Sequence, residues 1–416
     1  MRSILPLGLI ATALAVAPLR FDREKVLRVI PQDEKQTNVI KHLAQTNELD
    51  FWYPDAPHHV TANMTVDFRV SEKGFQSVQS ALDQSNMHYE ILIRDVQEEI
   101  EKQFDVKEDT TGRHSYAKYN NWDKIVAWTE KMVGKRPDVV SRIKIGSTVE
   151  DNPLYVLKIG KENERRAIFM DCGIHAREWV SPAFCQWFVY QATKSYGKNK
   201  IMTKLLDRMN FYVLPVFNVD GYIWSWTQNR MWRKNRSKHP NSTCIGTDLN
   251  RNFNASWSSS PSTNHPCMDT YRGPAPESEK ETKAVADFIQ SHLTSIKAYI
   301  TFHSYSQMLL FPYGYTSKLP PNYKDLVKVA KIGTEALSTQ YETRYIYGPI
   351  ASTIYPTSGS SLDWAYNLGI KHTFAFELRD QGRFGFLLPE SRIKPTCKET
   401  MLAVKFIAKY ILKHTT

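Results

Sequence analysis

The chain has 416 residues, of which 42% are hydrophobic and 23% are charged, and its formal net charge is +11 at pH 7. This length favours two domains over one. The sequence contains no internal repeat and no low-complexity tract, and no apolar run after the first residues approaches membrane-spanning length, which excludes repeat architectures and helical membrane proteins.

The chain begins with the pattern of a signal peptide. Residues 1–17 combine one arginine, an apolar core and Ala-x-Ala sites ending at Ala15 and Ala17. The segment is too short to be a membrane anchor. We therefore predict a soluble protein of the secretory pathway, where its five cysteines reach an oxidising compartment.

Residues 25–93 alternate short strand-like and helical runs, which is typical of a small α+β unit. In chain order the runs are KVLRVI, a helix over 36–47, VDFRV, a helix over 75–84, and HYEILI. Residues 95–108 then have the composition of an acidic, solvated helix that leads to a Thr-Thr-Gly turn. We place a domain boundary there, so that residues 18–109 form a first domain and residues 110–416 a second.

The two predicted domains differ in charge. The first contains eleven Lys or Arg against eighteen Asp or Glu, a net charge of −7, and the second has 42 against 25, a net charge of +17. An acidic segment ahead of a strongly basic one suggests that the first shields the second.

In the second domain, strand-like runs alternate with helical stretches, which predicts an α/β sheet covered by helices on both faces. The strands are LYVLKI, AIFMDC, FYVLPVFN, AYITF and HTFAFEL, and the helices span 122–134, 182–196, 277–293, 322–340 and 398–413. Polar motifs fall where strands end, which is where open α/β sheets bind ligands.

The segment IFMDCGIHAREWVSP places His175 and Glu178 three residues apart, directly after an apolar strand and a glycine. An imidazole and a carboxylate at this spacing face the same way on a helix or tight turn and can close on one metal ion. Zinc takes four ligands. Two protein ligands close together in the sequence and a distant third would leave the fourth coordination position open, as in catalytic zinc sites. The motif alone is weak, and a surface ion pair is the alternative.

Distant residues complete this pattern. His303 lies in the strand-like run AYITFHSYSQ and is a candidate third ligand, with a hydrogen-bonded core histidine as the alternative. Glu377 lies in HTFAFELRD, among apolar residues that predict burial. A buried carboxylate must be paired, protonated or near a metal, so Glu377 is a candidate base, with a salt bridge to Arg379 as the alternative.

Six motifs in a fixed order carry a family resemblance. They are GIHAREWVSP, NRMWRKNRS, GTDLNRNF, ITFHSYSQMLLFPYGY, YPTSGSSLDWAY and FAFELRD. With them, the chain resembles the metallocarboxypeptidases of the A/B subfamily in their proenzyme form. The resemblance implies a mixed sheet covered by helices on both faces, preceded by an inhibitory pro-domain that is a small α+β open sandwich.

The resemblance also implies a catalytic set. One zinc ion would be held by His175, Glu178 and His303, with a water in the open position. Glu377 would act as the general base for that water, and Arg233 would stabilise the negatively charged oxygen of the tetrahedral intermediate. The implied reaction is hydrolysis of the C-terminal peptide bond.

Recognition of a chain end requires groups that hold a carboxylate, and a planar guanidinium does this best. Asn250 and Arg251 match the carboxylate clamp of the family, and Tyr355 matches a mobile tyrosine that covers the bound end. Arg177 and Arg230 match accessory substrate contacts. Without the resemblance, each of these side chains could be an ordinary solvated group.

One position decides the predicted specificity. Leu362, in SSLDW, matches the floor of the pocket for the terminal side chain, where B-type enzymes have an acidic residue. Ile354, Leu310 and Ala375 match wall positions and are apolar or small. We therefore predict release of bulky aromatic or aliphatic residues. Asp363 lies one position away from the selective site.

Four of the five cysteines can form two disulfides, and spacing alone leaves three pairings open. The resemblance suggests Cys244–Cys267 and, as in the B-type branch, Cys172–Cys185. Cys397 is left as a small buried thiol in or near the last helix. Glycosylation sequons lie at Asn63, Asn235, Asn241 and Asn254.

The basic charge of the second domain falls into three clusters. They are Lys398, Lys405, Lys409 and Lys413; Lys194, Lys198, Lys200 and Lys204; and Arg230, Arg233, Lys234, Arg236 and Lys238. Secretion argues against nucleic acid as the partner, and the resemblance implies a heparin-type sulfated proteoglycan in a secretory granule. Two alternatives stay open: a catalytically inactive binding protein with the same fold, and a B-type enzyme for basic chain ends.

Overall fold

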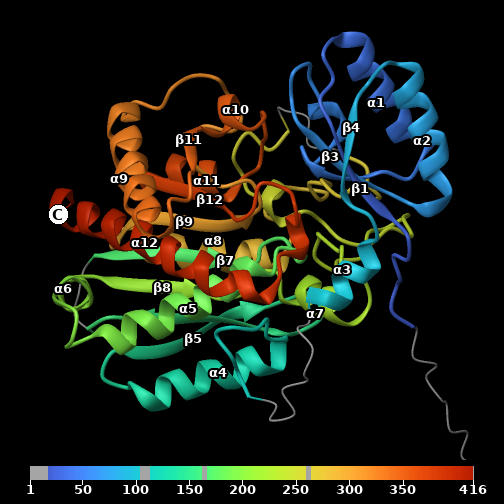
Figure 1. Ribbon diagram of the computed structural model, residues 1–416. Coiled ribbons are helices and arrows are strands. Elements are labelled where there is room, and N and C mark those ends of the chain that lie inside the picture. Colours follow the sequence, from blue (N-terminus) through green and yellow to red (C-terminus); the bar gives the residue numbers. More distant parts are fainter. Residues whose placement is uncertain (1–16, 104–112, 162–165, 259–263, 416) are drawn as a thin grey trace, which may run out of the picture.

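The computed structural model describes residues 17–103, 113–161, 166–258 and 264–415. They form a small N-terminal unit seated against one side of a larger unit (Figure 1). All but one residue of the predicted signal peptide, and the predicted boundary near Asp109 and Thr110, lie outside the described residues. Among the helices that are described, none has the length and apolar character needed to cross a membrane.

The small unit is a four-stranded antiparallel sheet, in the order β2-β3-β1-β4, with two helices on one face. Ile40 and Val78 of the helices pack against Phe68 of the sheet, and Asp33 and Ser71 cap the helix N-termini. The predicted open sandwich is confirmed. Its elements are β1 (Lys25–Val29), α1 (Glu34–Thr46), β2 (Asp50–Tyr53), η1 (Pro57–His59), β3 (Val66–Val70), α2 (Glu72–Gln84) and β4 (Tyr89–Ile93).

The large unit is built on an eight-stranded sheet in the order β11-β10-β12-β9-β7-β8-β6-β5. The central strands β12, β9, β7 and β8 are parallel, and β10, β6 and β5 join through antiparallel pairs, so the predicted mixed sheet is confirmed. The strands are β5 (Val140–Ser147), β6 (Pro153–Ile159), β7 (Ala167–Cys172), β8 (Asn210–Leu214), β9 (Ile296–Ser304), β10 (Met308–Phe311), β11 (Ile346–Pro349) and β12 (His372–Leu378).

Helices cover both faces of this sheet. One face carries α4 (Trp122–Lys135), α5 (Val180–Ser195), α6 (Lys200–Arg208), α7 (Val219–Thr227), α9 (Tyr323–Tyr341) and α12 (Ile393–His414). The other carries α8 (Lys280–Ser291) and α11 (Ser361–Asn367). Shorter connecting elements are α3 (Val96–Gln103), η2 (Leu249–Arg251), α10 (Ile350–Thr353), η3 (Gly385–Leu387) and η4 (Glu390–Arg392).

The alternation of side chains along the central strands decides which residues reach the site. On β12, Phe374 and Phe376 pack into the core beneath α5 and α12, so Ala375 and Glu377 project to the opposite face. Strand β9 pairs with β12 in a register that sets His303 beside Glu377. A one-residue slip would turn both polar side chains into the apolar core.

Two disulfides join parts of the large unit. Cys172 at the end of β7 is bonded to Cys185 in α5, and Cys244 is bonded to Cys267. Cys397 is a free thiol buried in α12. The predicted strand FYVLPVFN is shorter than expected, because β8 ends at Leu214, directly before a proline.

Candidate active site

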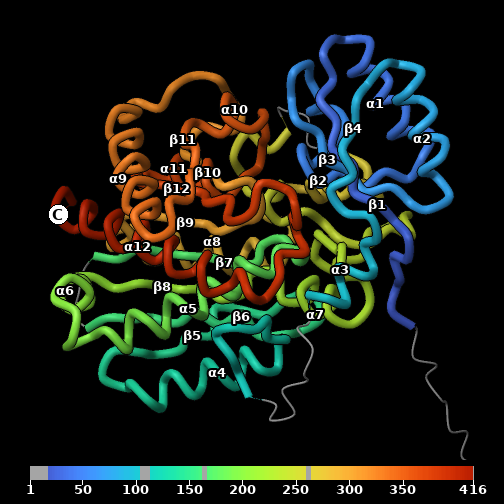
Figure 2. Tube along the Cα trace, in the orientation of Figure 1, coloured from blue at the N-terminus to red at the C-terminus, as the bar shows by residue number. Residues whose placement is uncertain are grey.

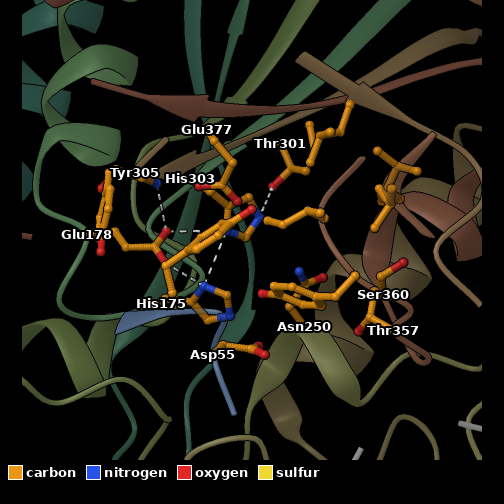
Figure 3. A pocket seen from close by; sticks show the side chains of 18 of the residues that line it. Asp55, His175, Glu178, Asn250, Thr301, His303, Tyr305, Thr357, Ser360 and Glu377 are labelled. Atoms are coloured by element: carbon orange, nitrogen blue, oxygen red, sulfur yellow. Dashed lines mark hydrogen bonds and ion pairs between the residues drawn. The ribbon is translucent and has the colours of Figure 1, made fainter. Parts of the chain in front are cut away.

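The site lies where β7, β9 and β12 end, on the sheet face that carries α8 (Figure 3). After β7 the chain turns at Gly173, whose φ is +70° and whose missing Cβ would lie 2.8 Å from Pro182. This turn brings His175 and Glu178 back over the strand ends, opposite His303 of β9. All three side chains are buried, and their ligand atoms lie within 4.8 Å of one another.

The three groups converge through defined atoms. Nδ1 of His175 lies 2.8 Å from Oε1 of Glu178, and Nδ1 of His303 lies 3.2 Å from Oε2 of the same carboxylate. The two Nδ1 atoms are 3.2 Å apart. Burial opposes the charge of Glu178, yet the two imidazoles hold its pKa far below the ordinary value.

The opposite ring nitrogens have partners of their own. Nε2 of His175 is 3.1 Å from Oδ1 of Asp248, and Nε2 of His303 is 3.2 Å from Oγ1 of Thr301. An acceptor at Nε2 leaves the Nδ1 lone pair free, which is the arrangement of a metal-binding histidine. Two imidazoles and one carboxylate with these supporting contacts fit zinc.

Glu377 projects beside the ligands without belonging to their set (Figure 3). Burial raises its pKa well above the ordinary value, and the neighbouring Glu178 carboxylate adds to the effect. The alternative pairing with Arg379 is wrong, because Arg379 bonds to Glu399 of α12 instead.

Two arginines face the ligands from the loops that follow α7 and precede α8. Nη2 of Arg233 lies 2.8 Å from Oδ2 of Asp248, so this one carboxylate holds both Arg233 and His175. Arg251 stands on η2, and Asn250 beside it accepts a hydrogen bond of 3.0 Å from the backbone N–H of Ser361. The sequence reasoning missed Asp248, although it lies within the motif GTDLNRNF.

Part of the pocket lining is aliphatic. This part includes Leu310, Ile350, Ile354, Leu362 and Ala375, and Leu362 is only 1% exposed. The neighbouring acid, Asp363, does not reach this space. Its carboxylate accepts hydrogen bonds from the backbone N–H groups of Gly314 and Tyr315, and burial raises its pKa to about 7.

Comparisons with known proteins agree with this geometry. Residues 125–403 match the zinc carboxypeptidase family, and residues 27–103 match the carboxypeptidase activation peptide. The chain belongs to the zinc carboxypeptidase family.

This zinc carboxypeptidase is 84% identical to mast cell carboxypeptidase A of Homo sapiens over 417 residues, covering 100% of both chains. It is 55% identical to carboxypeptidase B of Bos taurus, covering 95% of this chain and 94% of the relative. The crystal structure of thrombin activatable fibrinolysis inhibitor aligns with a TM-score of 0.90 at 42% identity, covering 95% of this chain and 100% of that one. The predicted family resemblance, with its activation peptide, is confirmed.

In this zinc carboxypeptidase the activation peptide occupies the entrance to the site. Figure 2 shows β2 on the side of the small unit that faces the large one. Asp55, which follows β2, bonds to Arg251 and lies 3.2 Å from Nη2 of Arg233. The ring of His59 stacks on Tyr355 at 4.4 Å. A volume of only about 70 Å³ is left in the pocket.

A second set of contacts lies beside the entrance. Nη1 of Arg177 bonds to Asp50 at 2.8 Å, and Nε of Arg230 bonds to Gln103 of α3 at 2.9 Å. Arg177 is not among the pocket-lining residues, whereas six other predicted site residues line it with the metal ligands. Those six are Glu377, Arg233, Asn250, Arg251, Tyr355 and Leu362.

The third expected basic cluster is not an exposed patch. Arg230, Arg233 and Lys234 are buried, because their cations bond to groups of the site and of nearby loops. The guanidinium of Arg236 lies 3.7 Å from the ring centroid of Trp224. A run of Lys and Arg residues in the sequence therefore does not show whether their side chains are buried or exposed to solvent.

Proposed function

We propose that the chain is the precursor of a secreted exopeptidase that releases bulky aromatic or aliphatic C-terminal residues. In this proposal residues 1–17 are a signal peptide, 18–109 the inhibitory pro-domain and 110–416 the catalytic domain. The relationship to mast cell carboxypeptidase A supports passage through the secretory pathway and storage in a secretory granule.

One observation carries this proposal. Asp55 presents a carboxylate between Arg251 and Arg233, at the mouth of an apolar pocket and beside the zinc ligands. A carboxylate there occupies the place proposed for the C-terminal carboxylate of a substrate. Asn250 and Arg251 are the proposed clamp for that group, with Arg177 as an accessory contact. Removal of the pro-domain would free Tyr355 from His59 to cover the bound chain end.

The residues around the metal divide the chemistry between them. When zinc is bound by His175, Glu178 and His303, it supplies a Lewis acid for water and the scissile carbonyl. The Glu377 carboxylate, whose ionised form bound zinc would favour, takes a proton from the attacking water and returns it to the departing amine nitrogen. The Arg233 guanidinium donates hydrogen bonds to the carbonyl oxygen as negative charge develops on it.

The apolar pocket makes a testable prediction of specificity. A terminal Lys or Arg would place its charge beside Leu362 without a partner, at a cost of about 3 kcal/mol or more. After pro-domain removal by limited proteolysis, we expect kcat/KM for a peptide ending in Phe to exceed that for the same peptide ending in Arg by more than about 100-fold. Free amino acids released from the two peptides measure this ratio.

Two outcomes of that assay would contradict the proposal. Equal or faster release of Arg would favour a B-type enzyme for basic chain ends. A zinc-loaded, proteolysed protein that releases neither residue would favour an inactive binding protein. The Leu362→Asp variant serves as a control, because a carboxylate at the pocket floor should shift the preference towards Arg.

We also propose that the catalytic domain binds a heparin-type sulfated proteoglycan through the α6–α12 basic surface. Helices α6 and α12 pack together and line a cavity of about 580 Å³. Six Lys and Arg side chains line this cavity, and none of them forms a salt bridge with another described residue. Their positive charges can therefore interact with an anionic partner. The six residues are Arg166, Lys200, Lys204, Arg208, Lys409 and Lys413.

Charge reversal tests this surface. The variant Lys204→Glu/Lys409→Glu should weaken heparin binding and reduce the slope of log K against log salt by about 2, since each lysine releases roughly one ion. The control Lys280→Glu/Lys283→Glu changes the net charge equally on α8, across the sheet. Equal weakening by both pairs, measured by calorimetry at several salt concentrations, would rule out a specific α6–α12 surface.

A further inference from the structure

The two histidine ligands are supported in different ways. Nε2 of His175 meets the Asp248 carboxylate directly. Nε2 of His303 instead meets the hydroxyl of Thr301, and Oγ1 of Thr301 lies 2.8 Å from Oδ1 of Asp171. Both imidazoles are therefore connected to a buried carboxylate, one directly and the other through a hydroxyl group.

The sheet register builds the second connection. Asp171 of β7 and Thr301 of β9 are paired residues of neighbouring parallel strands, and Thr301 and His303 share a face because they are two residues apart. Asp171 is 0% exposed. Burying a carboxylate this deeply costs desolvation free energy, so we expect Asp171 to have a role in its position next to the metal site.

We propose that Asp171 and Thr301 are positioning residues that fix His303 in its metal-binding tautomer. An ionised carboxylate only accepts hydrogen bonds, so the Thr301 hydroxyl donates its single proton to Asp171. Oγ1 can then only accept from Nε2 of His303, which places the ring proton on Nε2. The lone pair of Nδ1 is left pointing at His175 and Glu178.

The alternative tautomer shows why the carboxylate matters. Without Asp171 the Thr301 hydroxyl is free to rotate and donate to Nε2, which favours the ring proton on Nδ1. A histidine protonated on Nδ1 cannot bind a metal through that atom. Asp171 therefore acts on His303 through the direction of a hydrogen bond, without touching the metal or the substrate.

Metal affinity of the full chain tests this inference, and it does so independently of substrate preference. We expect Thr301→Val to raise the zinc dissociation constant about 10- to 100-fold in competition with a chromogenic chelator. Thr301→Ser keeps the hydroxyl and should stay within threefold of wild type. Asp171→Leu should lower zinc affinity about as much as Thr301→Val. Since both act through the same hydrogen-bond chain, the double variant should bind zinc about as well as the single variant with the lower affinity.

The matched control is Thr373→Val. Thr373 lies on β12 opposite Tyr299, is equally buried, and its hydroxyl has no hydrogen-bond partner among the described residues. Because it removes a buried hydroxyl that has no partner among these residues, Thr373→Val should leave the melting temperature of the metal-free protein unchanged or slightly raised, and zinc affinity should stay within threefold of wild type. The inference is overturned if Thr301→Val keeps wild-type zinc affinity, or if Thr373→Val weakens zinc binding equally.

Discussion

Replacement of Glu377 by Gln is expected to lower kcat by about 10²- to 10⁴-fold while one zinc ion stays bound. The amide has nearly the same size as the carboxylate but cannot take a proton from water. Glu377 stands beside the three ligands and is not one of them, so the metal site keeps its full set of donors. The measurement pairs kcat on a peptide ending in Phe with the zinc content of the same sample.

The matched control for this variant is Glu335→Gln, on the exposed face of α9. It removes one negative charge far from the site and should leave kcat unchanged. Turnover of Glu377→Gln within tenfold of wild type would remove Glu377 as the base. Loss of zinc from the variant would instead make Glu377 a metal-supporting residue.

Replacement of Arg251 by Ala is expected to lower kcat/KM on a free C-terminal carboxylate by about 10²- to 10³-fold. Truncating one partner of a buried, hydrogen-bonded charge pair costs about 2–5 kcal/mol, or about 30- to 5,000-fold, and the expected loss lies within these limits. The peptide amide, which lacks the terminal charge, should be cleaved slowly by the wild type and no more slowly by the variant. The ratio between the two substrates is therefore the quantity to measure.

The same arginine also holds the pro-domain, because Arg251 bonds to Asp55. In the full chain, Arg251→Ala should therefore loosen the contact between the two units as well as the grip on substrate. Arg251→Lys keeps the charge but loses the planar pair of donors, so an intermediate loss is expected. A variant that still prefers the free carboxylate as strongly as wild type does would assign the clamp to other residues.

Strong apolar patterns made much of the fold predictable. HTFAFEL was expected as a strand, and it forms β12 at the centre of the sheet. In contrast, β10 and β11 have four residues each, and β11 contains Gly348 and Pro349, so neither has a clear periodic signal. Strand β2 was also missed, because it has only four residues. Asp55, which enters the site, follows this strand.

The candidate site was predictable where its residues stand in motifs and was missed where contacts join distant segments. His175 and Glu178 share one turn, and that spacing indicated a metal. Asp55 and Arg251 are separated by 196 positions, so no local pattern connects them. The link from Asp171 to His303 depends on strand register, which becomes known only when β7 and β9 are paired.

The central claim is that His175, Glu178 and His303 hold one zinc ion that faces a pocket for an apolar chain end. The most direct measurement is a zinc titration of the proteolysed, metal-free protein while release of Phe from a peptide is followed. We predict that activity is absent without metal, rises in proportion to added zinc and levels off at one ion per chain. Release of Phe that persists in a strong chelator, or that does not return at one equivalent of zinc, would contradict the claim.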